Sequence, residues 1–324
     1  MEDEEFGQHG KEVFEKIEKI GSGTYGVVFK GYKKNQNGEK EVVAIKKMKI
    51  DLENEGIPST ALREISILRK LHNPNIVKLL DVVLNNNKLY LLFEYVDVDL
   101  HIFLSELKEK DLDEKLIKNI LYKILDAVAY CHSKKIIHRD IKPQNILLAK
   151  NGEIVKVADF GLARAFSSSK RQYTKEVLTL WYRAPELLLG LNEYSTPIDI
   201  WSIGCIFAEL FLKQPLFKGD NEIDQLLKIF GILGTPDKDI WPEFETMPNY
   251  SPVFPKFKPV KFEEYFPNMD KNGINLLKQM LAYNPNQRIT AKQAMMHVSF
   301  ILFIILYNNY SLILHHHHNS YFNL

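Results

Sequence analysis

Cysteine, net charge and long apolar runs are all scarce in this chain of 324 residues. Its two cysteines, Cys131 and Cys205, fall in apolar stretches of helical character, which favours buried reduced thiols over a disulfide or a metal site. The formal net charge is only +1, so no long-range field attracts the molecule to nucleic acid or to an anionic membrane. Residues 2–5 are acidic, unlike a secretory or mitochondrial leader. We therefore expect an intracellular protein of the cytoplasm or the nucleus, with local binding surfaces.

The longest apolar run lies near the end of the chain. Residues 298–306 are almost wholly apolar, but a membrane-spanning helix needs about 20 such residues, and Asn308 and Asn309 interrupt any extension. Residues 307–324 are rich in Asn and Tyr and include four histidines at 315–318. We expect 298–324 to be an irregular tail. A membrane anchor and a metal site at the four histidines are the alternatives.

What the sequence does contain is an ordered succession of strand and helix patterns, and its 45% hydrophobic residues suffice for one large domain or two modest ones. Strand-like segments occupy 14–20, 27–32, 42–48, 76–84 and 89–95, and helical patterns begin at Pro58 and recur at 116–128, 198–211, 222–233, 273–281 and 291–297. This order predicts an α+β fold with two lobes. We assign 1–13 to an acidic N-terminal extension, whose residues 1–5 should be irregular, 14–96 to a small β-rich lobe with one helix, 97–297 to a larger helical lobe, and 298–324 to the tail.

A glycine-rich turn at residues 21–28, GSGTYGVV, joins the first two strands. Dinucleotide-binding folds contain similar turns, but those lead from a strand into a helix, whereas strands flank this one on both sides. Because Gly21, Gly23 and Gly26 have no side chains, backbone amides there can approach phosphate oxygens closely. Lys46 ends the next apolar strand and would hold the α- and β-phosphates, with Glu64 of the following helix orienting it.

Apolar residues bracket these motifs and would sandwich a flat base, although core packing explains any one of them equally well. They are Ile20, Val28, Ala44, Phe93 and Leu147. Backbone groups of Glu94 and Val96, in the segment between the lobes, would supply hydrogen bonds to the base.

Residues 138–145 read HRDIKPQN, and residues 159–161 read DFG. In this pair of motifs Asp140 can accept a proton from a substrate hydroxyl, and Lys142 can neutralise a phosphoryl group in transfer. Asn145 and Asp159 offer the oxygen ligands that Mg²⁺ prefers. The place of His138 favours a structural histidine that supports the loop over a catalytic one.

Other polar residues are predicted to support this site. Thr179 should bond near Asp140 and Lys142, while Asp199 and the pair Glu186–Arg288 should be buried scaffold groups with partners.

With these motifs assembled, residues 14–297 resemble the eukaryotic protein kinases, and among them the cyclin-dependent kinases. PSTALRE at 58–64 is similar to the helix by which that family docks a cyclin, with Leu62 in place of the usual isoleucine. The segments 173–177, 179–186 and 219–226 are also similar, and 241–257 resembles an insert that binds a small adaptor subunit. The resemblance implies a Ser/Thr kinase that uses ATP and Mg²⁺, binds a cyclin, and modifies protein substrates at Ser/Thr-Pro sites.

The resemblance also implies how activity is controlled. Phosphate on Thr174 would add about −1.5 to −2 charges, which Arg63, Arg139 and Arg164 could capture. Phosphate on Thr24 or Tyr25 would lie where ATP's phosphates belong and should lower activity. Val177 and Arg183 should shape a pocket for the proline after the target residue.

Two alternatives and one departure accompany this assignment. A catalytically silent protein that only binds cyclin or adaptor is disfavoured because Lys46, Asp140 and Asp159 are all present. A mitogen-activated-type kinase needs Thr-x-Tyr in its activation segment, whereas Tyr173 directly precedes Thr174. Val298 stands where the family has a proline, which predicts a poorly capped final helix.

Overall fold

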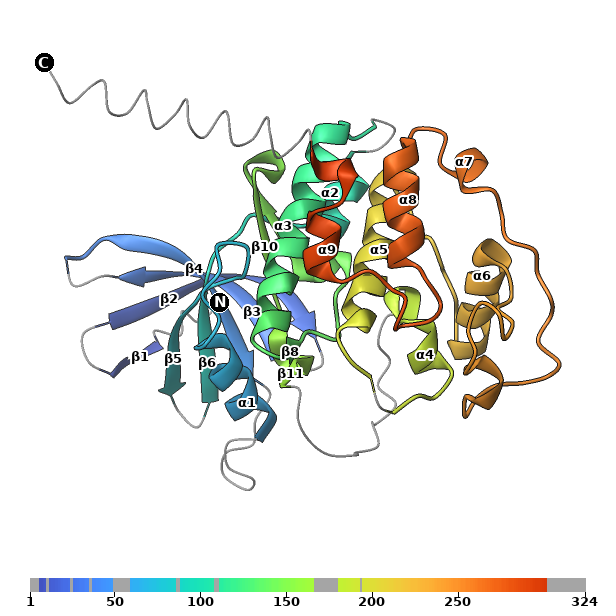
Figure 1. Ribbon diagram of the computed structural model, residues 1–324. Helices are drawn as coiled ribbons and strands as arrows, with labels where there is room; N and C mark the ends of the chain where they lie inside the picture. Colours follow the sequence, from blue (N-terminus) through green and yellow to red (C-terminus); the bar gives the residue numbers. More distant parts are fainter. Residues whose placement is uncertain are drawn as a thin grey trace, which may run out of the picture.

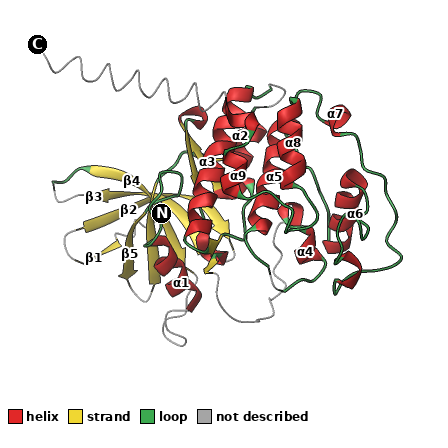
Figure 2. Ribbon diagram, viewed as in Figure 1, coloured by secondary structure: helices red, strands yellow, loops and turns green. Residues whose placement is uncertain are grey.

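The computed structural model describes residues 6–9, 12–23, 26–34, 37–48, 59–85, 88–107, 111–165, 180–192 and 194–301. Its longer strands gather in the first third of the chain and its helices dominate the remainder (Figure 1, Figure 2). The predicted α+β class with a β-rich lobe followed by a helical lobe is therefore confirmed.

An antiparallel sheet with the strand order β1-β2-β3-β4-β6-β5 forms the small lobe. Its strands are β1 (Phe6–His9), β2 (Glu12–Gly23), β3 (Gly26–Lys34), β4 (Lys40–Met48), β5 (Leu79–Asn85) and β6 (Lys88–Glu94). Alternation along β4 explains its two faces: Val43 and Ile45 pack in one apolar cluster, and Met48 packs in another. Within the predicted extension at 1–13, residues 6–9 form β1, because the edge of β2 supplies them with backbone partners. Residues 1–5, predicted to be irregular, lie outside the described residues.

Helix α1 (Ser59–Leu68) bridges the cores of the two lobes. Near its start, Ala61 packs with Met48, Leu89 and Leu91 of the sheet. At its other end, Ile67 and Leu68 join the main apolar core of the large lobe. A displacement of α1 would therefore disturb packing in both lobes.

Two long helices form the centre of the large lobe. They are α3 (Glu114–Ser133) and α5 (Pro197–Leu212), which contact each other, and α8 packs against α5 (Figure 1). Helix α5 is apolar on nearly all sides and is buried from Ile198 to Leu210, as expected for a central helix. The other helices are α2 (Leu100–Glu106), α4 (Pro185–Leu188), α6 (Glu222–Leu233), α7 (Phe262–Tyr265), α8 (Lys271–Met280) and α9 (Ala291–Met295).

Short strands and 3-10 turns shape the large lobe where it meets the small one. Strands β7 (Val98–Asp99), β9 (Ile146–Ala149) and β10 (Ile154–Val157) form one small sheet, and β8 (Ile136–Ile137) pairs with β11 (Arg164–Ala165). The 3-10 turns are η1 (Pro143–Asn145), η2 (Lys150–Gly152), η3 (Phe160–Leu162), η4 (Leu180–Tyr182) and η5 (Phe244–Thr246).

The end of the large lobe differs from its predicted boundary at residue 297. Helix α9 begins with a capping box between Thr290 and Gln293, and the chain is helical again over 298–301. Phe300 is 0% exposed, and its ring lies 5.5 Å from that of Tyr122 on α3. The folded lobe therefore extends at least to Phe300. The burial of this one aromatic side chain anchors the segment 298–301 to α3, although the sequence of the segment has no clear periodic pattern.

Several expectations about buried groups are confirmed. Arg288 Nη1 and Nη2 donate to the carboxylate of Glu186 at 2.7 and 3.0 Å, with both side chains buried. Cys131 and Cys205 are free and buried, and burial raises the pKa of each thiol. No helix among the described residues combines the length and apolarity that crossing a bilayer requires.

Candidate active site

The register of the small-lobe sheet puts several predicted nucleotide-binding residues in one row. Gly21 pairs with Val28, and Val28 pairs with Lys46. Directly paired residues of antiparallel strands share a face, so these three positions face the same side of the sheet. Ala44, two residues before Lys46 on β4, has the same orientation and pairs with Phe93 of β6.

The glycines of the turn have different structural roles. At Gly26 an added Cβ would lie 2.3 Å from the backbone oxygen of Lys47, so close packing of β3 on β4 alone requires glycine there. At Gly21 an added Cβ would meet only Val28 Cβ, at an ordinary 3.8 Å. The protein's own packing does not explain Gly21. A ligand that approaches the backbone would explain it. Gly23 lies at the end of β2, paired with Gly26.

The predicted base-contacting residues come from both lobes. Ile20 is 45% exposed on β2, whereas Val28, Ala44, Phe93 and Leu147 are partly buried. Leu147 belongs to β9 of the large lobe.

Two backbone positions end or follow β6, between the lobes. The backbone N–H of Glu94 donates to Lys78 O at 3.1 Å, so a contact between its backbone and the edge of a base would have to use its carbonyl. Val96 follows in the short connection between β6 and β7.

A cluster of three ionisable side chains joins β4, α1 and the DFG segment; Lys46 and Glu64 are buried, and the Asp159 side chain is 40% exposed. Lys46 Nζ lies 2.8 Å from Glu64 Oε1 and 3.0 Å from Asp159 Oδ1. Burial alone would lower the pKa of Lys46, but the carboxylates of Asp159 and Glu64 outweigh it and raise that pKa. Burial would likewise raise the pKa of Asp159, but Lys46 lowers it. At neutral pH the cluster thus holds an ammonium group and an ionised Asp159 side by side.

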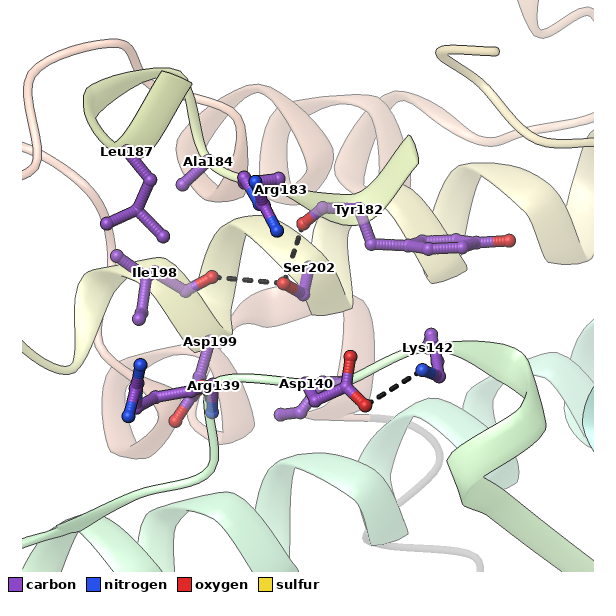
Figure 3. Close-up of a pocket in the computed structure, with 11 residues that line it drawn as sticks. Arg139, Asp140, Lys142, Tyr182, Arg183, Ala184, Leu187, Ile198, Asp199 and Ser202 are labelled. Carbon is purple, nitrogen blue, oxygen red and sulfur yellow. Dashed lines mark hydrogen bonds and ion pairs between the residues drawn. The ribbon is translucent and has the colours of Figure 1, made fainter. Parts of the chain in front are cut away.

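A second polar cluster surrounds Asp140. Its Oδ2 accepts hydrogen bonds from Lys142 Nζ at 2.8 Å and from Asn145 Nδ2 at 3.0 Å. Asn145 Nδ2 also donates to Asp140 O at 2.7 Å. Figure 3 shows one carboxylate oxygen of Asp140 turned to Lys142 and the other toward the segment of Tyr182 and Arg183. The second oxygen therefore lies on the side of the loop that faces residues 182–184.

The backbone of both clusters is strained and held by buried partners. Arg139 and Asp159 have φ angles of 74° and 62°, in the left-handed region that such residues seldom adopt. Asp199 Oδ1 accepts from Arg139 N at 2.8 Å, and its Oδ2 accepts from His138 N at 2.9 Å. A buried aspartate of α5 thus fixes the loop that carries Asp140.

The contacts of His138 are those of a structural residue. His138 is buried, its Nε2 lies 3.0 Å from Ala158 O, and its ring lies 4.8 Å from Phe160 in an edge-on contact. Ala158 N donates to Asn145 O at 2.9 Å. These contacts connect the HRD and DFG segments and so hold the two clusters together.

A small cavity of about 40 Å³ separates the Asp140 loop from residues 182–184 and the start of α5 (Figure 3). Its size suits water or a small group, not a nucleotide. Tyr182 is held on both sides by α5: Ser202 Oγ donates to its backbone oxygen at 2.8 Å, and its hydroxyl donates to Glu209 Oε2 at 2.6 Å.

The two predicted arginines of this region have partners that the sequence analysis did not identify. Arg183 Nη1 lies 3.2 Å from Glu222 Oε1 at the start of α6, and the guanidinium of Arg139 lies 5.4 Å from the ring centroid of Tyr194. Glu222, Tyr194, Ser202 and Glu209 lie 20 to 55 residues from the groups they contact, and no local pattern marks them. Only the arrangement of α5 and α6 around the loop reveals these pairs.

Some predicted residues lie outside the described part of the chain. These are Thr24, Tyr25, Thr174, Val177 and Thr179, and the side chains of Arg63 and Arg164. The backbone of Arg164 pairs with Ile137, two residues before Arg139.

Residues 14–300 match the family model described as protein kinase domain. The match spans both lobes and both polar clusters, and it ends at the buried Phe300.

Proposed function

Since this chain belongs to the protein kinase family, we propose that it transfers the γ-phosphoryl group of ATP to Ser or Thr hydroxyls that precede proline in proteins. The observation that carries the proposal is the pair of connected polar clusters, Lys46–Glu64–Asp159 and Asp140–Lys142–Asn145. In the first cluster, Lys46 can bind phosphate groups beside the ionised Asp159. In the second cluster, the carboxylate of Asp140 can accept the proton of a substrate hydroxyl.

The residues present fit a magnesium ion. Asn145 directs its amide nitrogen to Asp140, which leaves its carbonyl oxygen on the opposite side, and Asp159 is held in its ionised form by Lys46. Such oxygens are the ligands that Mg²⁺ prefers, and a site completed by phosphates and water needs only one or two protein ligands. This agrees with the finding that no group of three or more His, Cys, Asp or Glu side chains among the described residues could hold a metal. When bound, Mg²⁺ neutralises charge on the β- and γ-phosphates.

The protein's own groups would divide the work of transfer. Gly21, Gly23 and Gly26 admit the phosphates to the backbone, Lys46 holds the α- and β-phosphates, and Glu64 keeps Lys46 in place. The oxygen of the substrate hydroxyl forms a bond to the γ-phosphorus, and Asp140 accepts the proton of that hydroxyl. The bond between the γ-phosphorus and the oxygen that bridges to the β-phosphate breaks, so ADP leaves. Lys142, beside Asp140, neutralises charge on the group in transfer. Thr179 is proposed to bond near these two residues.

We further propose that a cyclin binds at residues 58–64 and that phosphorylation sets activity. Leu62 is 52% exposed on the same helix that presents Glu64 to Lys46, so a partner bound there would stabilise the ion pair. Phosphate on Thr174 would raise activity through Arg63, Arg139 and Arg164, and phosphate on Thr24 or Tyr25 would lower it.

Two further surfaces have proposed partners. Val177 and Arg183 would receive the proline of the substrate. The insert at 241–257 would receive a small adaptor subunit, and its exposed Val253 and Phe257 are suited to a protein contact.

The test is a phosphotransfer assay on matched Ser-Pro and Ser-Ala peptides, with and without added cyclin. We expect transfer to the Ser-Pro peptide only, and a strong increase with cyclin. Equal transfer to both peptides, or full activity without cyclin, would contradict the specificity or the regulation. A silent binding protein would bind nucleotide or cyclin without any transfer, and a mitogen-activated-type kinase would be active without cyclin.

The first specific prediction concerns Asp140→Asn. The amide keeps an oxygen for Lys142 but cannot take up the proton, so transfer should fall by roughly 10²- to 10⁴-fold. Nucleotide affinity, measured by calorimetry with ATP and Mg²⁺, should remain within about twofold because Asp140 is not expected to contact the nucleotide. A large loss of nucleotide binding would show that this role is misassigned.

A further inference from the structure

One lysine of the large lobe connects three segments behind the row of nucleotide-binding residues. Lys156 Nζ, on β10, lies 2.9 Å from Glu94 Oε1 and 2.9 Å from Pro74 O. The same oxygen of Glu94 accepts a hydrogen bond of 2.7 Å from Lys78 N. Lys156 thus joins the end of β6 to the loop between α1 and β5.

That loop is itself bound to the large lobe. Val157 N donates to Asn75 O at 2.8 Å, Val77 N donates to Val157 O at 3.0 Å, and Asn75 Nδ2 donates to Val155 O at 3.0 Å. Asn73 Nδ2 also donates to Asp126 Oδ2 of α3 at 2.8 Å. Although the sequence assigned residues 73–77 to the small lobe, bonds from Asn73, Asn75 and Val77 join this segment to the large one.

Glu94 is the last residue of the strand that leads out of the small lobe. Its backbone N–H is bound to Lys78 O, its Cα pairs with Val43 of β4, and its side chain is bound to Lys78 N and Lys156. Since the N–H is engaged, a backbone contact of Glu94 with a base would have to use its carbonyl. Fixing the side chain therefore also fixes the direction of this carbonyl.

We propose that Lys156 is a positioning residue for nucleotide binding: through the carboxylate of Glu94 it holds the backbone between the lobes in the orientation that receives the base. This inference rests on the proposed function. Without Lys156 the backbone at Glu94 would have more conformational freedom in the free protein and would lose that freedom when the nucleotide binds. This entropy cost should weaken nucleotide affinity, while the residues proposed to carry out phosphoryl transfer are unchanged.

The environment of the pair favours this role over that of an ordinary surface ion pair. The side chains of Lys156 and Glu94 are 16% and 27% exposed, and the lysine makes a second bond to Pro74. By contrast, Lys278 and Glu263 lie 3.1 Å apart but are 51% and 59% exposed, and they join α8 to α7 within one lobe. Exposed pairs of that kind contribute little, so Lys278 is a matched control.

The experiment compares Lys156→Met, Lys156→Arg and Lys278→Met with the unmodified chain. We measure the Kd of MgADP and MgATP by calorimetry, and KM for ATP and kcat on the Ser-Pro peptide with cyclin. Lys156→Met should raise Kd and KM roughly three- to tenfold and leave kcat within about twofold, because a charge-assisted bond is lost away from the reacting groups. Lys156→Arg should restore most of the affinity, and Lys278→Met should change neither constant.

Unchanged nucleotide affinity in Lys156→Met, or a lower kcat at constant KM, would overturn the inference while leaving the proposed function intact. If Lys156→Met does not fold, Glu94→Gln removes the charge pair but keeps an oxygen for Lys78 N, and it must then show the same rise in Kd. Failure of the unmodified chain to bind nucleotide would overturn both proposals.

Discussion

Glu209 lies buried on α5, where its Oε2 accepts a hydrogen bond of 2.6 Å from the Tyr182 hydroxyl. Burial raises its pKa to about 7, and the bond from Tyr182 only partly opposes this. Because the pKa in the unfolded chain is near 4.5, the folded state keeps a proton between pH 4.5 and 7 that the unfolded state has lost. Stability from this group is therefore complete below pH 4.5 and declines as pH rises to 7.

Replacing Glu209 by Gln should remove the loss of stability that accompanies ionisation of Glu209 between pH 4.5 and 7. The amide oxygen can still accept from Tyr182, but the residue no longer ionises. The difference of roughly 2.5 pH units corresponds to about 3 kcal/mol, so Glu209→Gln should be more stable than the unmodified chain at pH 8 and similar near pH 4.5. Urea unfolding at both pH values measures this. Glu264→Gln, on exposed α7, is the control and should follow the unmodified chain. Identical pH dependence of Glu209→Gln and the unmodified chain would contradict the argument.

At the scale of elements, local patterns predicted most of what was found. Runs of β-branched and aromatic residues between glycine-bearing turns predicted β2, β3 and β4, and apolar residues at helical spacing predicted α1 and α3. In the candidate site, sequence motifs identified Gly21, Val28 and Lys46 and the two segments of the large lobe, whereas the alignment of these three residues in one row follows from the strand register.

Features that depend on distant partners were missed. Strand β1 exists because β2 offers an edge, and 73–77 joins the large lobe through bonds to β10 and α3. The partners of Arg183 and Arg139, Glu222 and Tyr194, likewise follow from how α5 and α6 pack and not from a motif.

Helix α1 is the element whose proposed role is simplest to test. Leu62→Glu places a charge on its exposed side, where the cost of burying that charge should prevent a cyclin from docking. We expect cyclin-stimulated transfer to fall by roughly tenfold or more, while cyclin-free activity stays within about twofold. The measurement is a cyclin titration of peptide phosphorylation. Ile102→Glu, at a similarly exposed position on α2, should keep full stimulation. Normal stimulation of Leu62→Glu would exclude this surface as the docking site.

At the scale of the whole molecule, the boundary between the two lobes in the sequence differs from the boundary between their apolar cores. Ile67 and Leu68 of α1 belong to the same apolar core as α3 and α5, whereas the sheet has two smaller clusters of its own. The large lobe therefore holds one end of α1 and the loop that follows it. Relative motion of the lobes is then expected to involve the sheet and the start of α1, where Glu64 meets Lys46, more than the end of that helix.

The large lobe also depends on the last described turn of the chain. Phe300 is 0% exposed and packs on Tyr122 of α3, so Phe300→Ala should leave a cavity and cost about 3–5 kcal/mol. Met296→Ala is the matched control, because Met296 is 68% exposed in the same segment and its loss should cost less than about 0.5 kcal/mol. Urea unfolding followed by tryptophan fluorescence measures both, since Trp201 and Trp241 are buried in this lobe. Equal unfolding midpoints for the two variants would mean that the fold ends before Phe300. A clear difference would instead show that the large lobe needs residues beyond α9 for its stability.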